Sequence, residues 1–79
     1  MKWEEMNNLT RQSCIRACLD NSITFVEMER AWGCGKGTAR TWYASNKDKD
    51  FSGMELGGKV EKKTVEDVCK NLLGDKYSE

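Results

Sequence analysis

The sequence contains no histidine among its 79 residues, and none of its apolar runs approaches the length of a membrane-spanning helix. A transmembrane helix needs about 20 consecutive apolar residues, so we expect no membrane span. Residues 1–5 are polar and acidic, whereas a secretory signal peptide begins with basic residues followed by an apolar run. We therefore expect a cytoplasmic protein that does not associate with a membrane.

Features typical of an enzyme are missing as well. Without histidine the chain lacks a common general base, and no cysteine has an evident base beside it. Residues 33–37 superficially resemble a phosphate-binding loop, but they lack its spacing and the strand that precedes it. We expect a protein that is not an enzyme and that needs no cofactor.

The four cysteines form no Cys-x-x-Cys pair, the spacing often seen in zinc sites. Cys14 and Cys18 share one face of a predicted helix, so a metal site would need Cys34 and Cys69 to complete it. Free cysteines, however, are often buried and behave as small apolar side chains. Because each one stands where the helical pattern requires an apolar residue, we interpret all four as core residues and expect neither a metal site nor disulfides.

The formal net charge is zero, with 13 basic and 13 acidic residues, and the pI is about 6.3. This balance argues against a protein that coats nucleic acid without specificity. The charge is unevenly distributed, because residues 30–49 hold five basic residues and one acidic residue, Asp48. Some clustering is expected by chance, but a basic excess confined to one stretch also suits a specific DNA reader with a small phosphate footprint.

Residues 24–43 have the pattern of two short helices separated by a tight turn. Thr24, with Glu27 three residues later, forms a capping box at the start of the first helix. Trp32 lies on the apolar face of that helix, and Gly33 stands where a left-handed residue commonly ends a helix. The pattern predicts one helix over about 25–32 and another over about 36–44.

The second helix of this pair has a buried side and a basic side. We expect Gly35 to be its N-cap. Ala39 and Trp42 form the buried side, as Trp32 does in the first helix. The opposite side carries Lys36, Arg40 and Thr41.

This pattern resembles the helix-turn-helix of bacterial and phage DNA-binding proteins. In that family an apolar residue follows the turn glycine, a small or polar residue caps the second helix, and a buried aromatic residue or leucine follows. The residues that match the family's pattern are Met28, Trp32, Gly33, Cys34, Ala39 and Trp42. The family favours a small residue four before the turn glycine, where the helices cross closely, but this chain has Glu29 there. We expect either a more open crossing or a Glu29 side chain that turns out to solvent.

A further helix is predicted before this motif, over about 9–20. We expect Asn8 to cap it. Its buried stripe consists of Cys14 or Ile15, followed by Cys18 and Leu19. Trp3 and Met6 continue the same period backwards, so an earlier start near Lys2 is also compatible with the sequence. The sequence leaves open whether Trp3 packs in the core or belongs to a partner surface.

The last predicted helix, over about 65–73, is clearly amphipathic. Thr64 caps it, and Gly74 ends it. Its apolar residues recur with a helical period: Val65, Val68, Cys69, Leu72 and Leu73.

The stretch 45–63 contains three glycines and many charges but no helical period. In one interpretation, residues 54–56 and 59–61 pair as a small hairpin around Gly57 and Gly58, and nearby lysines reach phosphates as a wing. In the other, the stretch is an ordered loop pinned by Phe51, Met54 and Leu56. We favour the loop, because the strands would be short and their alternation is imperfect.

Four helices with the motif in the second and third are similar to the lambda-repressor-like domains, which include Cro and related phage repressors. The resemblance implies an all-α fold: a compact four-helix domain with a long loop or small hairpin before the last helix. It also implies a transcriptional repressor of phage or mobile-element type that binds an inverted repeat in double-stranded DNA as a homodimer. The alternative is a small protein-interaction module, such as a phage-encoded inhibitor of a host protein, which the neutral charge favours.

In such domains the second helix of the motif enters the major groove. Lys36 and Arg40 are the leading base readers, because both can donate hydrogen bonds to guanine. The glycines allow the start of this helix to approach DNA closely, where its unpaired N–H groups could bind a phosphate. The expected DNA-binding residues are Gly35, Lys36, Gly37, Thr38, Arg40, Thr41, Lys47 and Lys49.

Overall fold

The computed structural model describes residues 2–55 and 62–73, and the regular structure in those ranges is helical throughout, without a strand. A short 3-10 helix, η1 (Trp3–Glu5), precedes four α-helices. These are α1 (Asn8–Asp20), α2 (Phe25–Trp32), α3 (Thr38–Asn46) and α4 (Lys62–Leu73). The radius of gyration of the Cα atoms is 11.7 Å, about what a compact chain of this length has. The expectation of a compact all-α chain with four helices is therefore confirmed for the described residues.

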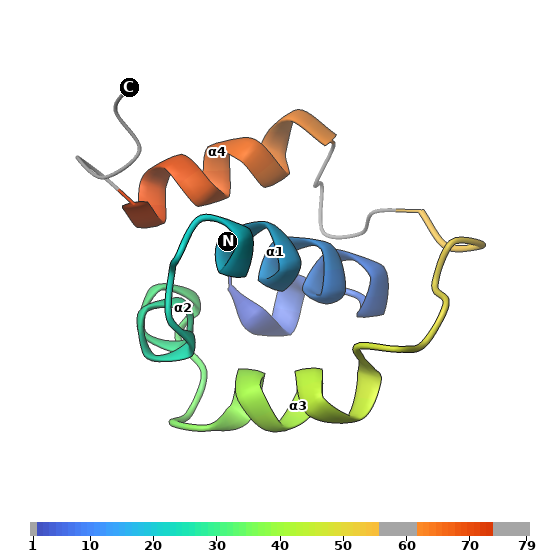
Figure 1. Ribbon diagram of the computed structural model, residues 1–79, viewed down its shortest axis with the longest axis horizontal. Helices are drawn as coiled ribbons and strands as arrows, with labels where there is room; N and C mark the ends of the chain where they lie inside the picture. The colour runs from blue at the N-terminus through green and yellow to red at the C-terminus, as the bar shows by residue number, and fades with distance from the viewer. Residues whose placement is uncertain (1, 56–61, 74–79) are drawn as a thin grey trace.

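Helix α1 lies at the centre of the arrangement (Figure 1), with α4 along one side of it and α3 along the other. Helix α2 is seen nearly end-on in this view and contacts both α3 and α4. Because α3 and α4 lie on opposite sides of α1, the side of α3 that faces away from α1 is open to solvent. No helix in the described ranges is long and apolar enough to cross a membrane.

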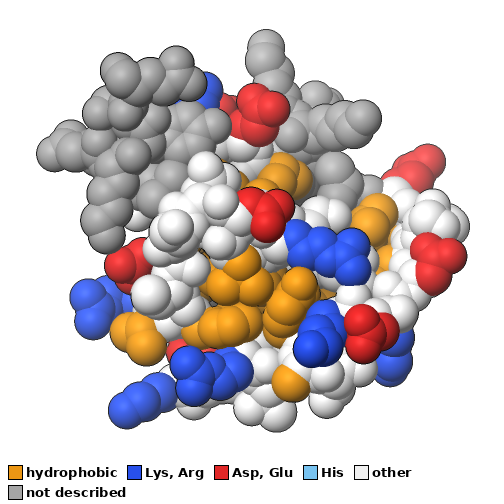
Figure 2. All heavy atoms as spheres, viewed as in Figure 1, with side chains coloured by type: hydrophobic (Ala, Val, Ile, Leu, Met, Phe, Trp, Pro, Cys, Tyr) orange, Lys and Arg blue, Asp and Glu red, His pale blue; other side chains and the backbone are white. Residues whose placement is uncertain are grey.

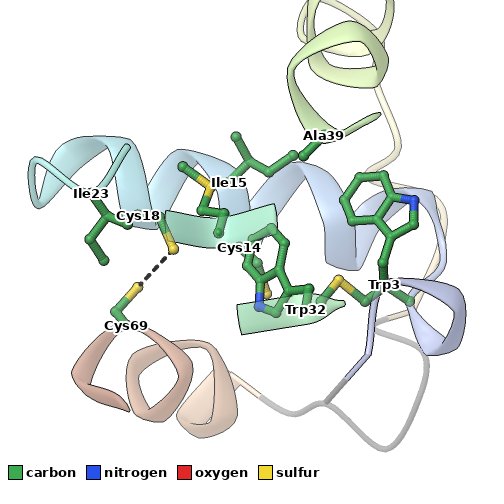
Figure 3. Close-up of a cluster of buried hydrophobic side chains, with 10 residues drawn as sticks. Trp3, Cys14, Ile15, Cys18, Ile23, Trp32, Ala39 and Cys69 are labelled. Atoms are coloured by element: carbon green, nitrogen blue, oxygen red, sulfur yellow. Dashed lines mark hydrogen bonds between the residues drawn. The ribbon is translucent and has the colours of Figure 1, made fainter. Parts of the chain in front are cut away.

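The core gathers around α1 (Figure 3), and three of the four cysteines belong to it. The Sγ atoms of Cys18 on α1 and Cys69 on α4 lie 4.0 Å apart, which joins the two helices. All four thiols are free, and Cys34 is half-buried beside the core. The prediction that the cysteines occupy apolar positions is confirmed for the three that are buried. The buried apolar residues are Trp3, Met6, Cys14, Ile15, Cys18, Ile23, Met28, Trp32, Ala39 and Cys69.

The structure decides the place of Trp3, which is buried in the core. Its ring stacks on Trp32 with 6.0 Å between ring centroids, and it meets the edge of Trp42 at 5.7 Å. The guanidinium carbon of Arg11 lies 4.2 Å from the centre of the same ring. Aromatic pairs at such distances stabilise a core beyond the apolar area they bury. Trp3 thus joins the end of α2 to α3.

The structure corrects the predicted start of the first helix. Asn7, not Asn8, is the N-cap of α1, and its Oδ1 accepts a hydrogen bond from the Thr10 N–H at 2.9 Å. The helix does not extend back to Lys2, because residues 3–5 form the separate turn η1. Leu19 was expected in the buried stripe but is 37% exposed.

The start of the last helix also differs from the prediction. Helix α4 begins at Lys62, so Thr64 lies inside its first turn and is not its cap. Lysine has a good helix propensity, which favours the longer helix. The packed residues of α4 are Val65, Val68, Cys69 and Leu72. Gly74, predicted to end the helix, lies outside the described residues.

The described part of the connection between α3 and α4 packs on α3 and α1. Phe51 stacks on Trp42 with 6.3 Å between ring centroids, as expected for a residue that pins this loop. Met54 does not pin it, because its side chain is 40% exposed after a turn in which its N–H donates to the Phe51 carbonyl. Asn7 Nδ2 donates to the Glu55 carbonyl at 2.7 Å. The predicted hairpin turn and second strand, together with Leu56, lie outside the described residues.

Candidate nucleic-acid interface

Helix α2 begins and ends with the residues that the sequence indicates. The Thr24 Oγ1 accepts a hydrogen bond from the Glu27 N–H at 3.3 Å, which confirms the predicted N-cap. Gly33 is the C-cap and adopts a left-handed conformation with φ of +71°. A side chain in this conformation is strained, which is why glycine is favoured at this position. The turn between α2 and α3 therefore follows from local sequence.

The start of α3 differs from the prediction. Gly35 was expected to cap a helix that began at 36, but Gly37 is the N-cap and the helix begins at Thr38. Gly37 has a φ of +84°, a left-handed conformation that cannot continue within a right-handed helix. The Thr38 N–H donates to the Gly35 carbonyl at 3.0 Å, which closes a turn before the helix. Lys36 consequently lies in this turn and not on the helix.

Glu29, on α2, holds the N-terminal end of α3. Its side chain is only 5% exposed, so the expectation that it turns out to solvent is wrong. Its Oε2 accepts hydrogen bonds from the Ala39 N–H at 3.0 Å and from the Arg40 N–H at 3.4 Å. The N-cap Gly37 has no side chain with which to pair these donors. A carboxylate also complements the positive end of the helix dipole.

The same hydrogen bonds keep Glu29 ionised. Burial by itself raises the pKa of the Glu29 carboxyl. The N–H groups at the start of α3 and the positive charge of Arg40 outweigh burial, so the pKa lies below its ordinary value. Because Glu29 occupies the N–H groups of Ala39 and Arg40, the prediction that the N–H groups at this helix start are unpaired is wrong for these two. A phosphate there would meet a carboxylate instead of free donors.

The C-terminal end of α3 is held from α1. Gln12 is 4% exposed, and its Nε2 donates to the carbonyls of Asn46 at 3.1 Å and Lys49 at 2.8 Å. Arg16, on the same helix, donates to the Lys47 carbonyl at 2.7 Å. Unpaired carbonyls make this end of a helix negative, so an amide N–H and a guanidinium are suitable partners.

Sequence reasoning missed these three contacts, although two of the residues carried a signal. Glu29 replaces the small residue expected at the helix crossing, and Gln12 interrupts an apolar stripe of α1. Buried polar side chains are informative because each needs a partner. Within the described ranges three polar residues are buried, namely Thr10, Gln12 and Glu29. Two of the three bind the ends of α3.

The outer side of α3 is polar and exposed between these two ends. Ala39 is fully buried, and Figure 3 shows it beside Ile15 of α1. Trp42 was predicted on the buried side and is half-buried. The exposed residues of α3 are Thr38, Arg40, Thr41, Ala44 and Ser45.

The structure divides the eight predicted contact residues between the two ends of α3. Residues 35–41 gather at its start, whereas Lys47 and Lys49 follow its far end. The nine residues of α3 rise about 13 Å, so Lys47 lies roughly that far along the helix axis from Thr38. Seven of the eight are exposed, and Gly37 is half-exposed.

A shallow hollow lies where α2 meets the start of α3, and we call it the basic hollow. Its lining residues are Phe25, Val26, Glu29, Arg30, Cys34, Lys36, Gly37 and Arg40. The guanidinium carbon of Arg40 lies 5.7 Å from the ring centre of Phe25, within the range of a cation–π contact. Val26 is 50% exposed among these cations. Figure 2 shows Lys and Arg side chains gathered along the lower left of this face, where α2 and the start of α3 lie.

Chemically, the basic hollow and the outer side of α3 offer guanidinium, ammonium and hydroxyl donors beside small apolar groups. Such a surface suits a polyanion whose edges carry hydrogen-bond acceptors and methyl groups. Among the described residues, no group of three or more His, Cys, Asp or Glu side chains is placed to hold a metal ion. No protein-family model, curated protein or solved structure matches this chain.

Proposed function

We propose that this chain is a sequence-specific DNA-binding regulator of the helix-turn-helix type and that α3 reads the major groove. The observation that carries the proposal is that α3 is held at both ends by Glu29 and Gln12 while its outer side stays exposed and polar. A recognition helix must keep a fixed orientation, because base contacts depend on the geometry of individual hydrogen bonds. An α-helix also fits the width of the major groove.

Within this proposal, Arg40 is the principal base reader. It is exposed, lies in the first turn of α3, and has its guanidinium placed over Phe25. An arginine can donate two parallel hydrogen bonds to guanine O6 and N7. Thr38 and Thr41 are also exposed and can contact a thymine methyl group or a phosphate.

Phosphate contacts in the proposal come from side chains, since Glu29 occupies the helix terminus. Exposed ammonium groups lie at both ends of α3: Lys36 in the turn before it, and Lys47 and Lys49 after it. Phosphate contacts at both ends of α3 would set its register along the groove. A protein with few such contacts depends less steeply on salt than a general DNA-coating protein does.

We further propose the arrangement of the lambda-repressor-like domains, which the sequence resembles, and binding as a homodimer to an inverted repeat. The longest Cα extent of the chain is 33 Å. Successive major grooves on one face of DNA are about 34–36 Å apart, so two adjacent copies could each present an α3 to one half-site. Repression of transcription by such a dimer is the regulatory role that this resemblance implies.

The decisive experiment is selection of bound duplexes from a random DNA pool. Enrichment of a short inverted repeat is the expected result, and its half-site spacing would measure the distance between the two recognition helices. If a folded, monodisperse sample enriches no sequence, the proposal is refuted. A partner pull-down would then test the protein-interaction alternative.

Two substitutions then separate base reading from phosphate binding. Arg40→Ala should weaken binding to the selected site by about 1–3 kcal/mol and relax the preference at one base pair. Lys47→Ala should weaken binding to all sequences alike and reduce the salt slope by about one. Lys70→Ala, on α4 away from α3, is the matched control for loss of one positive charge. If the two test variants bind like this control, α3 does not face the DNA.

A further inference from the structure

We infer that Glu29 is a positioning residue for sequence recognition: it orients α3, and thereby the base-reading side chains, without contacting DNA. This inference rests on the proposed function. Glu29 is buried, and the donors to its Oε2 are backbone N–H groups of α3. One of those donors is the N–H of Arg40, so Glu29 holds the backbone of the proposed principal base reader.

Glu29 links the two helices through both its main chain and its side chain. Its carbonyl accepts hydrogen bonds from the N–H groups of Gly33 and Cys34, the latter at 3.1 Å, which define the turn after α2. Its carboxylate, at the other end of the same residue, accepts from the first turn of α3. A single residue therefore relates the direction of α3 to that of α2.

The N-terminus of α3 has no equivalent partner of its own. Its N-cap, Gly37, makes no side-chain hydrogen bond to the helix, whereas Thr24 at the start of α2 does. If the Glu29 carboxylate is shortened, the donors at Ala39 and Arg40 lose their acceptor and the first turn of α3 is free to shift. A shift of the first turn moves the side chains nearest the bases, so sequence preference should fall.

The negative charge of Glu29 has a second, opposite effect. The carboxylate lines the basic hollow together with Lys36 and Arg40. A negative charge beside a phosphate-binding surface weakens binding to every DNA sequence alike. Removing the charge should therefore tighten non-specific binding, whereas removing the reach of the side chain should lower specificity. A residue that only stabilised the fold would change neither once binding is corrected for the folded fraction.

Two substitutions separate reach from charge. Glu29→Gln keeps the length and one acceptor oxygen but loses the charge. Glu29→Asp keeps the charge but is one methylene shorter. For each variant, affinity is measured for the selected duplex and for a scrambled duplex, below the unfolding midpoint and with the folded fraction taken from circular dichroism. Glu66→Gln, which removes the charge of an exposed carboxylate on α4 by the same chemical change, is the matched control for charge.

We expect Glu29→Asp to lower the ratio of specific to non-specific affinity by roughly 5- to 150-fold, the range for loss of one bidentate base contact. We expect Glu29→Gln to keep the ratio within a few-fold of the wild type while it tightens binding to both duplexes. If Glu29→Asp keeps the wild-type ratio, or if Glu29→Gln loses it as fully, the inference is overturned. A wild-type protein that prefers no duplex would instead refute the proposed function, and the inference with it.

Discussion

Gln12→Glu tests whether α1 holds the C-terminal end of α3. The substitution replaces the amide NH2 by an oxygen of nearly the same size, so it removes the donor without opening a cavity. In the wild type this NH2 faces the carbonyls of Asn46, Lys47 and Lys49 at 3.1, 3.5 and 2.8 Å. A carboxylate oxygen would instead face three carbonyl oxygens in a position that is 4% exposed.

The expected loss of stability follows from these contacts. Two of the three hydrogen bonds have good geometry, and each contributes about 1 kcal/mol net. The new carboxylate is also a buried charge without a partner, and an uncompensated buried charge costs about 3–5 kcal/mol. Since Arg16 donates to the adjacent Lys47 carbonyl and its charge is close by, we expect the lower end, about 3 kcal/mol. A domain of 79 residues has roughly 4–12 kcal/mol in all.

The assays are urea denaturation and thermal unfolding, each monitored by circular dichroism. A loss of about 3 kcal/mol corresponds to a fall of roughly 12–24 °C in Tm for a domain of this size. Gln12→Ala, which loses the donor but adds no charge, should cost about 2 kcal/mol. The deficit of Gln12→Glu should also shrink in acid, because the protonated carboxyl regains a donor. Gln12→Glu with a stability within about 0.5 kcal/mol of the wild type at neutral pH would refute the role assigned to Gln12.

Three further predictions concern the core, a buried carboxylate and the thiols. Trp3→Ala should lower the free energy of unfolding by about 3–5 kcal/mol in urea denaturation. A urea midpoint equal to that of the wild type would place Trp3 outside the core. The lowered pKa of Glu29 contributes stability that is present above its ordinary value of 4.5 and is lost as the pH falls through the folded value. Between about pH 6 and pH 3 the Tm of Glu29→Gln should therefore fall less than the Tm of the wild type, as calorimetry at both pH values would show. Burial and, to a smaller extent, the nearby Cys69 raise the pKa of the Cys14 thiol to about 12. A thiol reagent should therefore label the half-buried Cys34 first and Cys14 only on unfolding. Prompt labelling of Cys14 in the native protein would contradict its burial.

Local signals in the sequence were sufficient for α2 and the turn that follows it. A hydroxyl at Thr24 caps the helix because its acceptor lies within three residues of the donor that it binds. Gly33 ends the helix because glycine alone adopts a positive φ at little cost. The same reasoning failed at α3, where Gly35 and Gly37 are both acceptable N-caps by local criteria. The backbone conformation of Gly37, set within the folded chain, selects the later start.

The candidate site divides in the same way. The sequence identified exposed cations and hydroxyls around α3, and their DNA-binding role stays a prediction. It did not identify Gln12, Arg16 or Glu29, because their partners lie between 10 and 37 residues away in the chain. Contacts over such separations depend on how helices pack, and no periodicity or capping rule specifies that.

By itself, therefore, the sequence determined the helical content, the apolar positions of Cys14 and Cys18, and the turn at Gly33, since helical period and left-handed glycine act over a few neighbouring residues. Only the tertiary structure decided that Trp3 joins the core, that Glu29 is buried, and that α3 is held at both ends. The physical reason is that buried polar and aromatic side chains take their partners from other helices, and those partners come within reach only when the helices pack around α1.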